Sequence, residues 1–302
     1  MIDHHPANAA LEFLQAKHPE DYALAKQHWL KQVEANPVNA AVLSNAAGFI
    51  SQDDFKGSEK LLQTASKLEP TSCEYPRLLS RLYLNELQGE GLQKYAQDSA
   101  AAMLKALDIH ENCKGDCYLS PYAAMETSLL AEMLLNMNFP AEAKTLAIRL
   151  LPKNAPKEIA RLQWMTQYNA YPGYAAHSLL GRIAISENDI QRAKEHLAKQ
   201  VLEPSPKMPD LSLAGMLLDL NENEAVLEFL KSCRVLFENW LAHVSGPNSV
   251  IRIEWHRRGI PNALSEQREH EIEIMNSRIN RCSRWIASIE KSKPPKHMMW
   301  TK

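Results

Sequence analysis

The stretch 179–200, LLGRIAISENDIQRAKEHLAKQ, contains two amphipathic segments separated by a short polar turn. The first segment carries Gly181 among larger apolar residues, and the second follows Asn188 and Asp189 and begins with the small residue Ala193. A small residue in one helix lets a neighbouring helix approach closely, while larger residues fill the remaining space. The stretch therefore predicts a helix, a turn and a second helix, and not a catalytic loop.

The same pattern recurs earlier in the chain, at 42–70, as VLSNAAGFISQDDFKGSEKLLQTASKLEP. Ala46 takes the place of Gly181 there, and Ser58 takes the place of Ala193. Residues 22–37, YALAKQHWLKQVEANP, match the second half of the unit. Ser58 and Ala193 are 135 positions apart, which is about four periods of roughly 34 residues.

The turn residues predict where the helices begin and end. We expect Asn188 to be the N-cap of the second helix, with Gln191 three residues later in capping-box position. Pro70 and Pro204 close the two units because proline cannot continue a helix.

These residues resemble the tetratricopeptide-repeat (TPR) family. HSLLGRIA at 177–184, followed by DLSLAGMLLDLNENEAVLEFLKSC at 210–233, is also similar to a group of bacterial TPR proteins. The resemblance implies an α-solenoid and no catalytic residues. We therefore expect an all-α fold: TPR-like helical hairpins over 1–242, and a C-terminal capping helix with a basic tail over 243–302.

A long polar helix is predicted at about 263–291. Its apolar residues alternate by three and four positions: Ile272, Met275, Ile279, Cys282, Ile286 and Ile289. We expect this stripe to cover the apolar end of the last hairpin, since the ends of repeat arrays need a cap. Its use as a homodimer seam is the alternative, so the chain is expected to be a monomer or a homodimer.

The composition narrows the class of protein. Of the 302 residues 45% are hydrophobic and 23% charged, and the formal net charge of −2 gives no overall basic field for nucleic acid. No apolar run is long enough to span a membrane, and the N-terminus lacks the pattern of a signal peptide. Five cysteines are few for this length, which favours reduced thiols and a cytoplasmic location.

The sequence contains few motifs that indicate an enzyme or a metal site. His110, Cys113 and Cys117 lie within eight residues and can supply three zinc ligands, but no fourth ligand stands nearby, so we interpret this segment as a turn between helices. His270-Glu271 lacks the second histidine of a metalloprotease helix, and no phosphate-binding, dinucleotide-binding or nucleophile-elbow motif is present. We expect no enzyme activity, metal or cofactor. A metal-binding sensor or enzyme centred on His110, Cys113 and Cys117 is the alternative.

A basic cluster near the C-terminus combines Arg252, His256, Arg257 and Arg258 with Trp255. Cationic and aromatic residues together are typical of nucleic-acid contacts. We interpret the cluster as a solvated face, and a nucleic-acid-associated regulator acting through this region is a further alternative.

Polar and aromatic residues are dense at 168–182. The repeat phase set by Gly181 places Ser178 and Arg182 on the concave face of their helix, where Arg182 can meet a carboxylate of a partner. We expect Asn169, Tyr174, Ser178 and Arg182 to contact a protein or peptide partner, and His177 to occupy a packing position. The expected function is a scaffold or adaptor that binds through this face.

Overall fold

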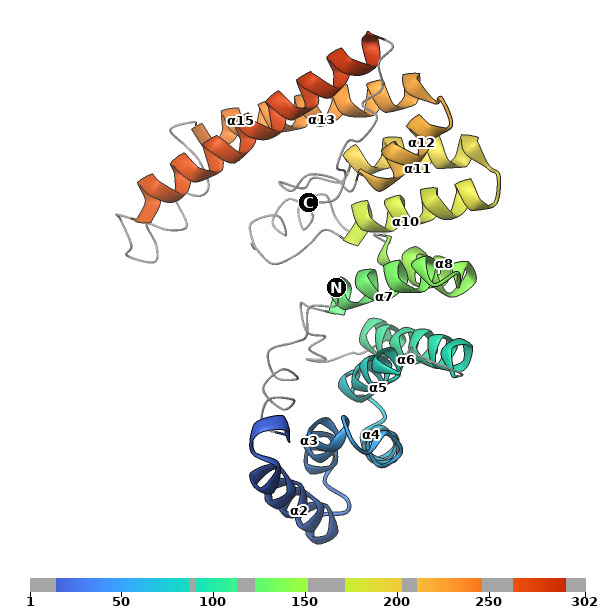
Figure 1. The fold of residues 1–302 in the computed structure, drawn as a ribbon, viewed down its shortest axis with the longest axis vertical. Helices are drawn as coiled ribbons and strands as arrows, with labels where there is room; N and C mark the ends of the chain where they lie inside the picture. Colours follow the sequence, from blue (N-terminus) through green and yellow to red (C-terminus); the bar gives the residue numbers. More distant parts are fainter. Residues whose placement is uncertain are drawn as a thin grey trace. The chain divides into compact units, whose positions relative to one another are not determined.

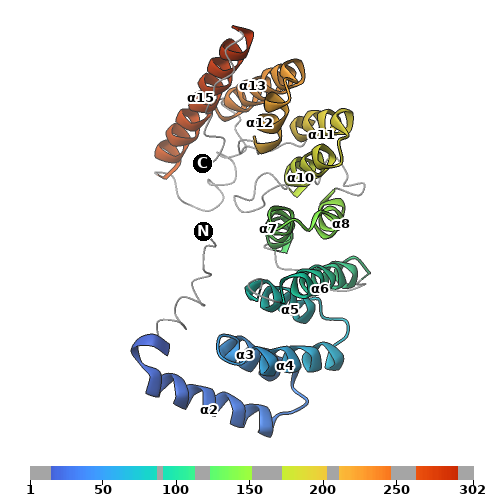
Figure 2. The same cartoon turned by 45° about the vertical axis from the view of Figure 1, so that its right-hand side comes forward.

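The computed structural model describes residues 15–86, 91–112, 123–151, 172–202, 211–245 and 263–291, and all regular secondary structure within these ranges is helical. The expectation of an all-α fold is confirmed for this part of the chain. The chain divides into two compact units, Met1–Ala123 and Ala124–Lys302, and Figures 1 and 2 show the helices of each.

Among the described residues, the helices of the first unit whose bounds are given are α2 (Pro19–Ala35), α3 (Ala40–Ile50), α4 (Phe55–Leu68), α5 (Glu74–Asn85) and α6 (Leu92–Asn112). Each helix packs against the next one along the chain, so sequence neighbours are also neighbours in space (Figure 2). The contacts between them are apolar, and the buried residues that form two clusters are Ala40, Leu43, Ala47, Leu62, Ala65, Tyr75, Leu79, Leu82 and Tyr83.

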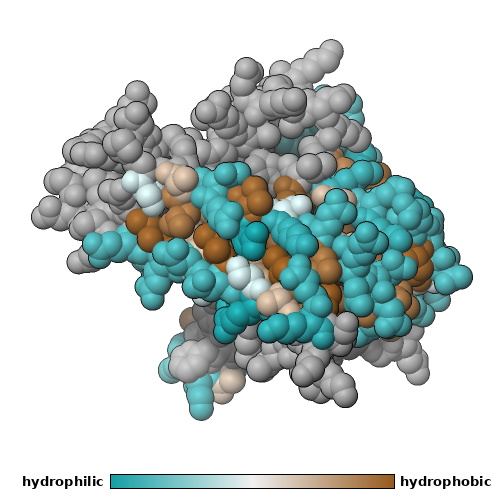
Figure 3. Space-filling view, turned by 90° about the horizontal axis from the view of Figure 1, so that it is seen from above, coloured by the Kyte–Doolittle hydropathy of each residue, from teal (hydrophilic) through white to brown (hydrophobic). Residues whose placement is uncertain are grey.

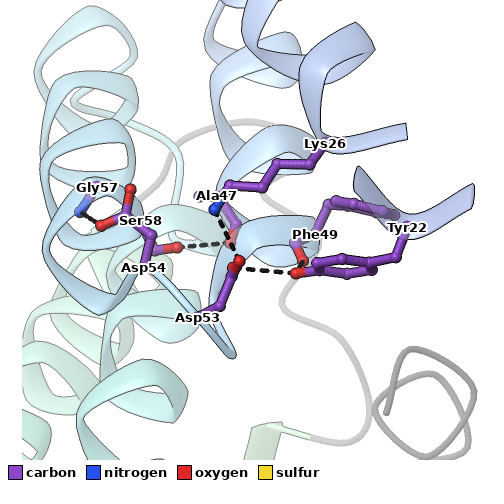
Figure 4. A network of polar contacts seen from close by, with 8 residues as sticks. All are labelled: Tyr22, Lys26, Ala47, Phe49, Asp53, Asp54, Gly57 and Ser58. Atoms are coloured by element: carbon purple, nitrogen blue, oxygen red, sulfur yellow. Dashed lines mark hydrogen bonds and ion pairs between the residues drawn. The ribbon is translucent and has the colours of Figure 1, made fainter. Parts of the chain in front are cut away.

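Polar contacts fix the turn between α3 and α4 (Figure 4). Asp54 is the N-cap of α4 and accepts a hydrogen bond from the backbone N–H of Gly57 at 2.8 Å. Its neighbour Asp53 accepts from the hydroxyl of Tyr22 at 3.0 Å and from the ammonium of Lys26 at 2.7 Å, and both donors lie on α2. Burial and the Asp53 carboxylate raise the pKa of Tyr22 to about 12. The acidic turn therefore both starts α4 and attaches α2.

The second unit contains seven described helices: α7 (Ala123–Asn136), α8 (Pro140–Leu150), α10 (Pro172–Ser186), α11 (Ile190–Leu202), α12 (Ser212–Asp219), α13 (Asn223–Ser245) and α15 (Ala263–Glu290). Three of its turns share one backbone geometry. Asn138, Asn188 and Asn221 have φ angles of 66°, 61° and 65°, which asparagine adopts more readily than most residues.

The hydrogen bonds of these three turns are also the same. After α10, the N–H of Asn188 donates to the carbonyl of Ile185 at 2.9 Å, and the N–H of Asp189 donates to that of Ala184 at 2.8 Å. The equivalent pairs follow α7 and α12. This is the Schellman motif, in which the left-handed residue ends a helix and satisfies its last carbonyls.

The expected N-cap of α11 is wrong by one residue. Asn188 ends α10 in the left-handed conformation, and Asp189 caps α11 by accepting from the backbone N–H of Arg192 at 3.0 Å. The backbone must leave the α10 conformation before α11 can begin. Asn188, the first of the two turn residues, therefore ends α10, and Asp189 is the residue that caps α11. Asp189 is thus the counterpart of Asp54.

The three hairpins also share their buried positions. Seven residues before each left-handed asparagine lies a small buried residue: Ala131, Gly181 or Ala214. Five residues after it the buried residue is Ala143, Ala193 or Val226. Asn188 and Asn221 are 33 positions apart, whereas Asn138 and Asn188 are 50 apart, because residues 152–171 come between α8 and α10. Nevertheless, α8 and α10 pack directly against each other.

The closest of these contacts joins α10 to α12. A Cβ atom added to Gly181 would lie 2.2 Å from a methyl carbon of Leu213, and Leu213 is completely buried. Real side-chain atoms do not approach this closely, so any side chain at position 181 would force that of Leu213 to shift. The contact brings α12 into the apolar core that also contains Ala193, Leu197 and Phe229.

The apolar stripe of the C-terminal helix is buried within the same core. Met275, Cys282, Ile286 and Ile289 of α15 are at most 5% exposed, and Ile279 packs against them in part. Figure 1 shows α15 running along α13, against which it packs. The stripe therefore covers the preceding hairpin within one chain. Figure 3 views this end of the unit, where hydrophobic residues lie in a band flanked by hydrophilic ones.

Replacement of Gly181 tests the close contact. We expect Gly181→Leu to lower the free energy of unfolding by about 1–3 kcal/mol or more, because the added side chain must push Leu213 out of a packed core. Gly48→Ala in α3 is the matched control, since nothing lies within 4 Å of the added Cβ and alanine favours a helix by about 0.5–1 kcal/mol. Thermal and denaturant unfolding measure both. A Gly181→Leu protein as stable as the wild type would contradict the contact.

Candidate partner-binding site

Arg182 on α10 is engaged within the chain. Its Nη1 donates to both carboxylate oxygens of Glu132 on α7, at 2.6 and 2.7 Å, and its Nη2 donates to Oδ1 of Asn136 at 2.9 Å. The arginine side chain is 13% exposed and that of Glu132 is 39% exposed. The carboxylate that Arg182 meets in the structure belongs to the same chain and lies 50 residues away, and its contact with a partner's carboxylate stays a prediction.

The other predicted contact residues differ in their exposure to solvent. Ser178 is buried, Tyr174 is half-buried, and both already interact within the chain. Asn169 lies outside the described residues. On α10 the structure thus brings Tyr174, Ser178 and Arg182 onto one helix, but leaves little of their polar surface available to a partner.

A buried histidine pair lies between α10 and α11. His177 and His196 are each 8% exposed, and their Nδ1 atoms are 3.0 Å apart. One ring must carry a proton on Nδ1 and donate it to the other, whose Nδ1 is unprotonated. Burial lowers the pKa of His177 to about 4, with His196 and Lys199 adding to the effect. Burial also lowers the pKa of His196, with contributions from Lys199 and Arg192.

Gln200 lies one turn after His196 and is 1% exposed. Neither its amide nitrogen nor its amide oxygen has a hydrogen-bond partner in the described structure. The equivalent positions of the other hairpins carry Leu150 and Cys233, and those equivalent to His196 carry Leu146 and Phe229. The α10–α11 hairpin is therefore more polar inside than its neighbours, which lowers its expected stability.

The histidine pair predicts acid sensitivity. Both pKa values lie below the ordinary value of about 6.5, so the unfolded chain binds more protons as the pH falls from about 6.5 towards 4. The free energy of unfolding should fall across that range, by up to about 1.4 kcal/mol per pH unit for each proton. The variant His177→Thr/His196→Leu carries the residues found at the equivalent positions of α7 and α8, and should lose this slope. An unchanged slope would show that other groups cause it.

The Arg182 contact is expected to stabilise the packing of α10 on α7. We expect Arg182→Ala to lower the free energy of unfolding by about 1–2 kcal/mol, because it removes charge-assisted hydrogen bonds from a mostly buried guanidinium. A double-mutant cycle with Glu132→Ala isolates the pair, and a coupling energy above about 0.5 kcal/mol is expected. Fully additive effects would show that the pair contributes nothing.

A cavity of about 710 Å³ lies against the exposed face of α13. Its described lining residues follow one side of that helix over three turns: Glu224, Leu227, Glu228, Lys231, Ser232 and Val235. Val235 is 49% exposed, although it is a large apolar residue. The opposite side of α13, with Phe229, Leu230 and Phe237, is buried in the core. We refer to the six lining residues as the α13 groove.

The charged residues of the α13 groove differ in whether they form an ion pair. Lys231 pairs with Glu290 of α15 at 3.2 Å. Glu224 and Glu228 are exposed and one helical turn apart, and neither makes an ion pair with another described residue. The groove thus combines apolar side chains with two unpaired carboxylates.

The sequence reading missed this groove, although a signal was present. In 223–238, NEAVLEFLKSCRVLFE, the apolar residues exceed what one buried stripe requires. Leu227 and Val235 fall outside the stripe formed by Val226, Leu230 and Phe237. Apolar residues on the solvent side of an amphipathic helix are an ordinary indication of a contact surface.

Most of the other candidate metal-binding and nucleic-acid-binding residues lie outside the described part of the chain. Cys113, Cys117 and the basic cluster with Trp255 belong to that group, and His110 lies at the end of α6. Within the described residues there is no group of three or more His, Cys, Asp or Glu side chains arranged to hold a metal ion. Nor is any helix of this part of the chain long and apolar enough to cross a membrane.

The thiols that the structure describes are buried. Cys73, Cys233 and Cys282 are free cysteines. Burial raises the pKa of Cys233 far above its usual range, and burial raises that of Cys282 to about 11. These thiols stay protonated near neutral pH, so they are poor nucleophiles.

The chain matches no model of a known protein family, and no curated protein matches it in sequence.

Proposed function

We propose that this protein is a non-enzymatic module that binds a protein or peptide partner, and that the α13 groove is its contact site. The observation that carries the proposal is an exposed, partly apolar helix face beside a cavity of about 710 Å³. Ligand-binding cavities have volumes of about 300–1,000 Å³ and combine apolar walls with a few polar groups.

The repeated hairpins support a scaffold role. They share one turn geometry and one set of buried small residues, and the offset of 33 positions between Asn188 and Asn221 is close to the TPR length of about 34. We propose that they are TPR-like units of an α-solenoid. In this proposal the Arg182–Glu132 pair holds α7 and α10 together and does not contact the partner.

The described chemistry also favours binding over catalysis. The histidine pair is neutral and buried, the three described thiols are protonated, and none of these groups lines the α13 groove. We propose a cytoplasmic location, because the described cysteines are unpaired.

Selection from an unbiased peptide library against the full chain tests the proposed function. The affinity of the selected peptides is then measured by fluorescence anisotropy for the wild type and for Leu227→Asn/Val235→Asn. We expect the double variant to weaken binding at least tenfold, because it replaces the apolar part of the groove with polar amides and adds no charge.

Val38→Asp is the matched control, since Val38 is 77% exposed and lies between α2 and α3. It should bind as the wild type does and keep the wild-type melting temperature. The double variant should melt at a lower temperature, because Leu227 packs partly against the core, but should remain folded under the conditions of the binding assay. Selected peptides that bind the double variant with undiminished affinity would refute the α13 groove as the contact site.

A further inference from the structure

We propose that the partner of the α13 groove is a cationic amphipathic peptide, with lysine or arginine opposite Glu224 and Glu228 and apolar side chains against Leu227 and Val235. This inference rests on the proposed function and adds the chemical class of the partner. It follows from two carboxylates that form no ion pair with a described residue, from their spacing, and from the half-buried Leu227 and the exposed Val235 beside them.

The carboxylates are the clearest element. Glu224 and Glu228 are four residues apart on one helix, so their Cβ atoms are about 5–6 Å apart and their like charges repel by a few tenths of a kcal/mol. Two neighbouring acidic residues do have cations: Glu222 pairs with Lys194 at 3.0 Å, and Glu290 pairs with Lys231 at 3.2 Å. A cation from outside the chain would relieve the repulsion at Glu224 and Glu228, and an anion would increase it.

The apolar residues define the rest of the partner. Leu227 and Val235 are eight residues apart, which is about 12 Å along the axis of α13. This is roughly the distance between residues seven or eight positions apart on a partner helix, the spacing by which helical peptides bind a groove. Lys231 lies between them and pairs with Glu290. Glu224 and Glu228 therefore have no pairing cation among the described residues.

A second copy of the same face is disfavoured as the partner. A symmetric dimer places each patch against its own counterpart. Such a dimer through the α13 groove would bring four unpaired carboxylates, Glu224 and Glu228 from each copy, close together. The charge therefore favours a different, basic partner over self-association.

Two synthetic helical peptides of the same length test the inference. Both carry leucine at positions one and eight, and one carries lysine where the other carries glutamate. Fluorescence anisotropy with the full chain measures their affinities. We expect the lysine peptide to bind at least tenfold more tightly, and its affinity to fall as salt rises from about 0.05 to 0.5 M because the contact is exposed and screened.

Glu224→Gln/Glu228→Gln should lower the affinity for the lysine peptide by about tenfold and reduce the salt dependence of that affinity. The melting temperature of the protein should not change. Glu195→Gln on α11, an exposed residue outside the groove, should leave binding unchanged. Equal affinity for both peptides, or an unaffected Gln variant, would overturn the inference.

The two proposals fail in different ways. Library-selected peptides that are neutral or acidic, and whose binding depends on Leu227 and Val235, would leave the proposed function standing and refute a cationic partner. Tight binding of the lysine peptide that Leu227→Asn/Val235→Asn does not affect would refute the groove itself. Self-association of the full chain that is lost in Leu227→Asn/Val235→Asn would identify a second copy as the occupant and also overturn the inference.

Discussion

The close approach of α12 to α10 at Gly181 is the constraint on which the second unit depends. A Cβ added at position 181 would lie 2.2 Å from a methyl carbon of Leu213, so a larger residue there would force the buried Leu213 side chain to move. The core that contains Leu213 continues through α11 and α13 to the buried stripe of α15. Small residues at the equivalent positions, Ala131 and Ala214, are likewise buried. A single hairpin of this unit cannot bury its own apolar residues. The hairpins therefore stabilise one another through the core that they share.

This packing determines which groups are available to a partner. It buries the polar residues of the α10–α11 hairpin, His177, His196 and Gln200, where they make the interior more polar without reaching the surface. It also draws Arg182 onto Glu132. Helix α13 is different, because α11, α12 and α15 cover one side of it and leave the α13 groove exposed. Binding is thus more naturally assigned to α13 than to α10.

Much of the helical framework follows from local sequence, because it depends on short-range patterns. The spacing of small and large residues predicted both helices around Gly181 and the packing position of His177, and the three-and-four alternation predicted the C-terminal helix. The N-cap was placed one residue early, since periodicity does not reveal that Asn188 takes a left-handed conformation. The partner of Arg182 could not be found this way: helical phase gives the direction of a side chain, but Glu132 is distant in sequence. The α13 groove was missed because the prediction placed the contact surface on the helix that carries Arg182.

Amide hydrogen exchange of the full chain, followed by mass spectrometry, tests most directly whether one shared core holds the second unit together. If it does, peptides from α10, α11, α12, α13 and α15 should be protected to a similar degree and should exchange through one cooperative opening. Exchange of α15 at the rate of an unstructured peptide, while α10–α13 stay protected, would contradict the account. It would show that the buried stripe does not belong to the core that contains Leu213.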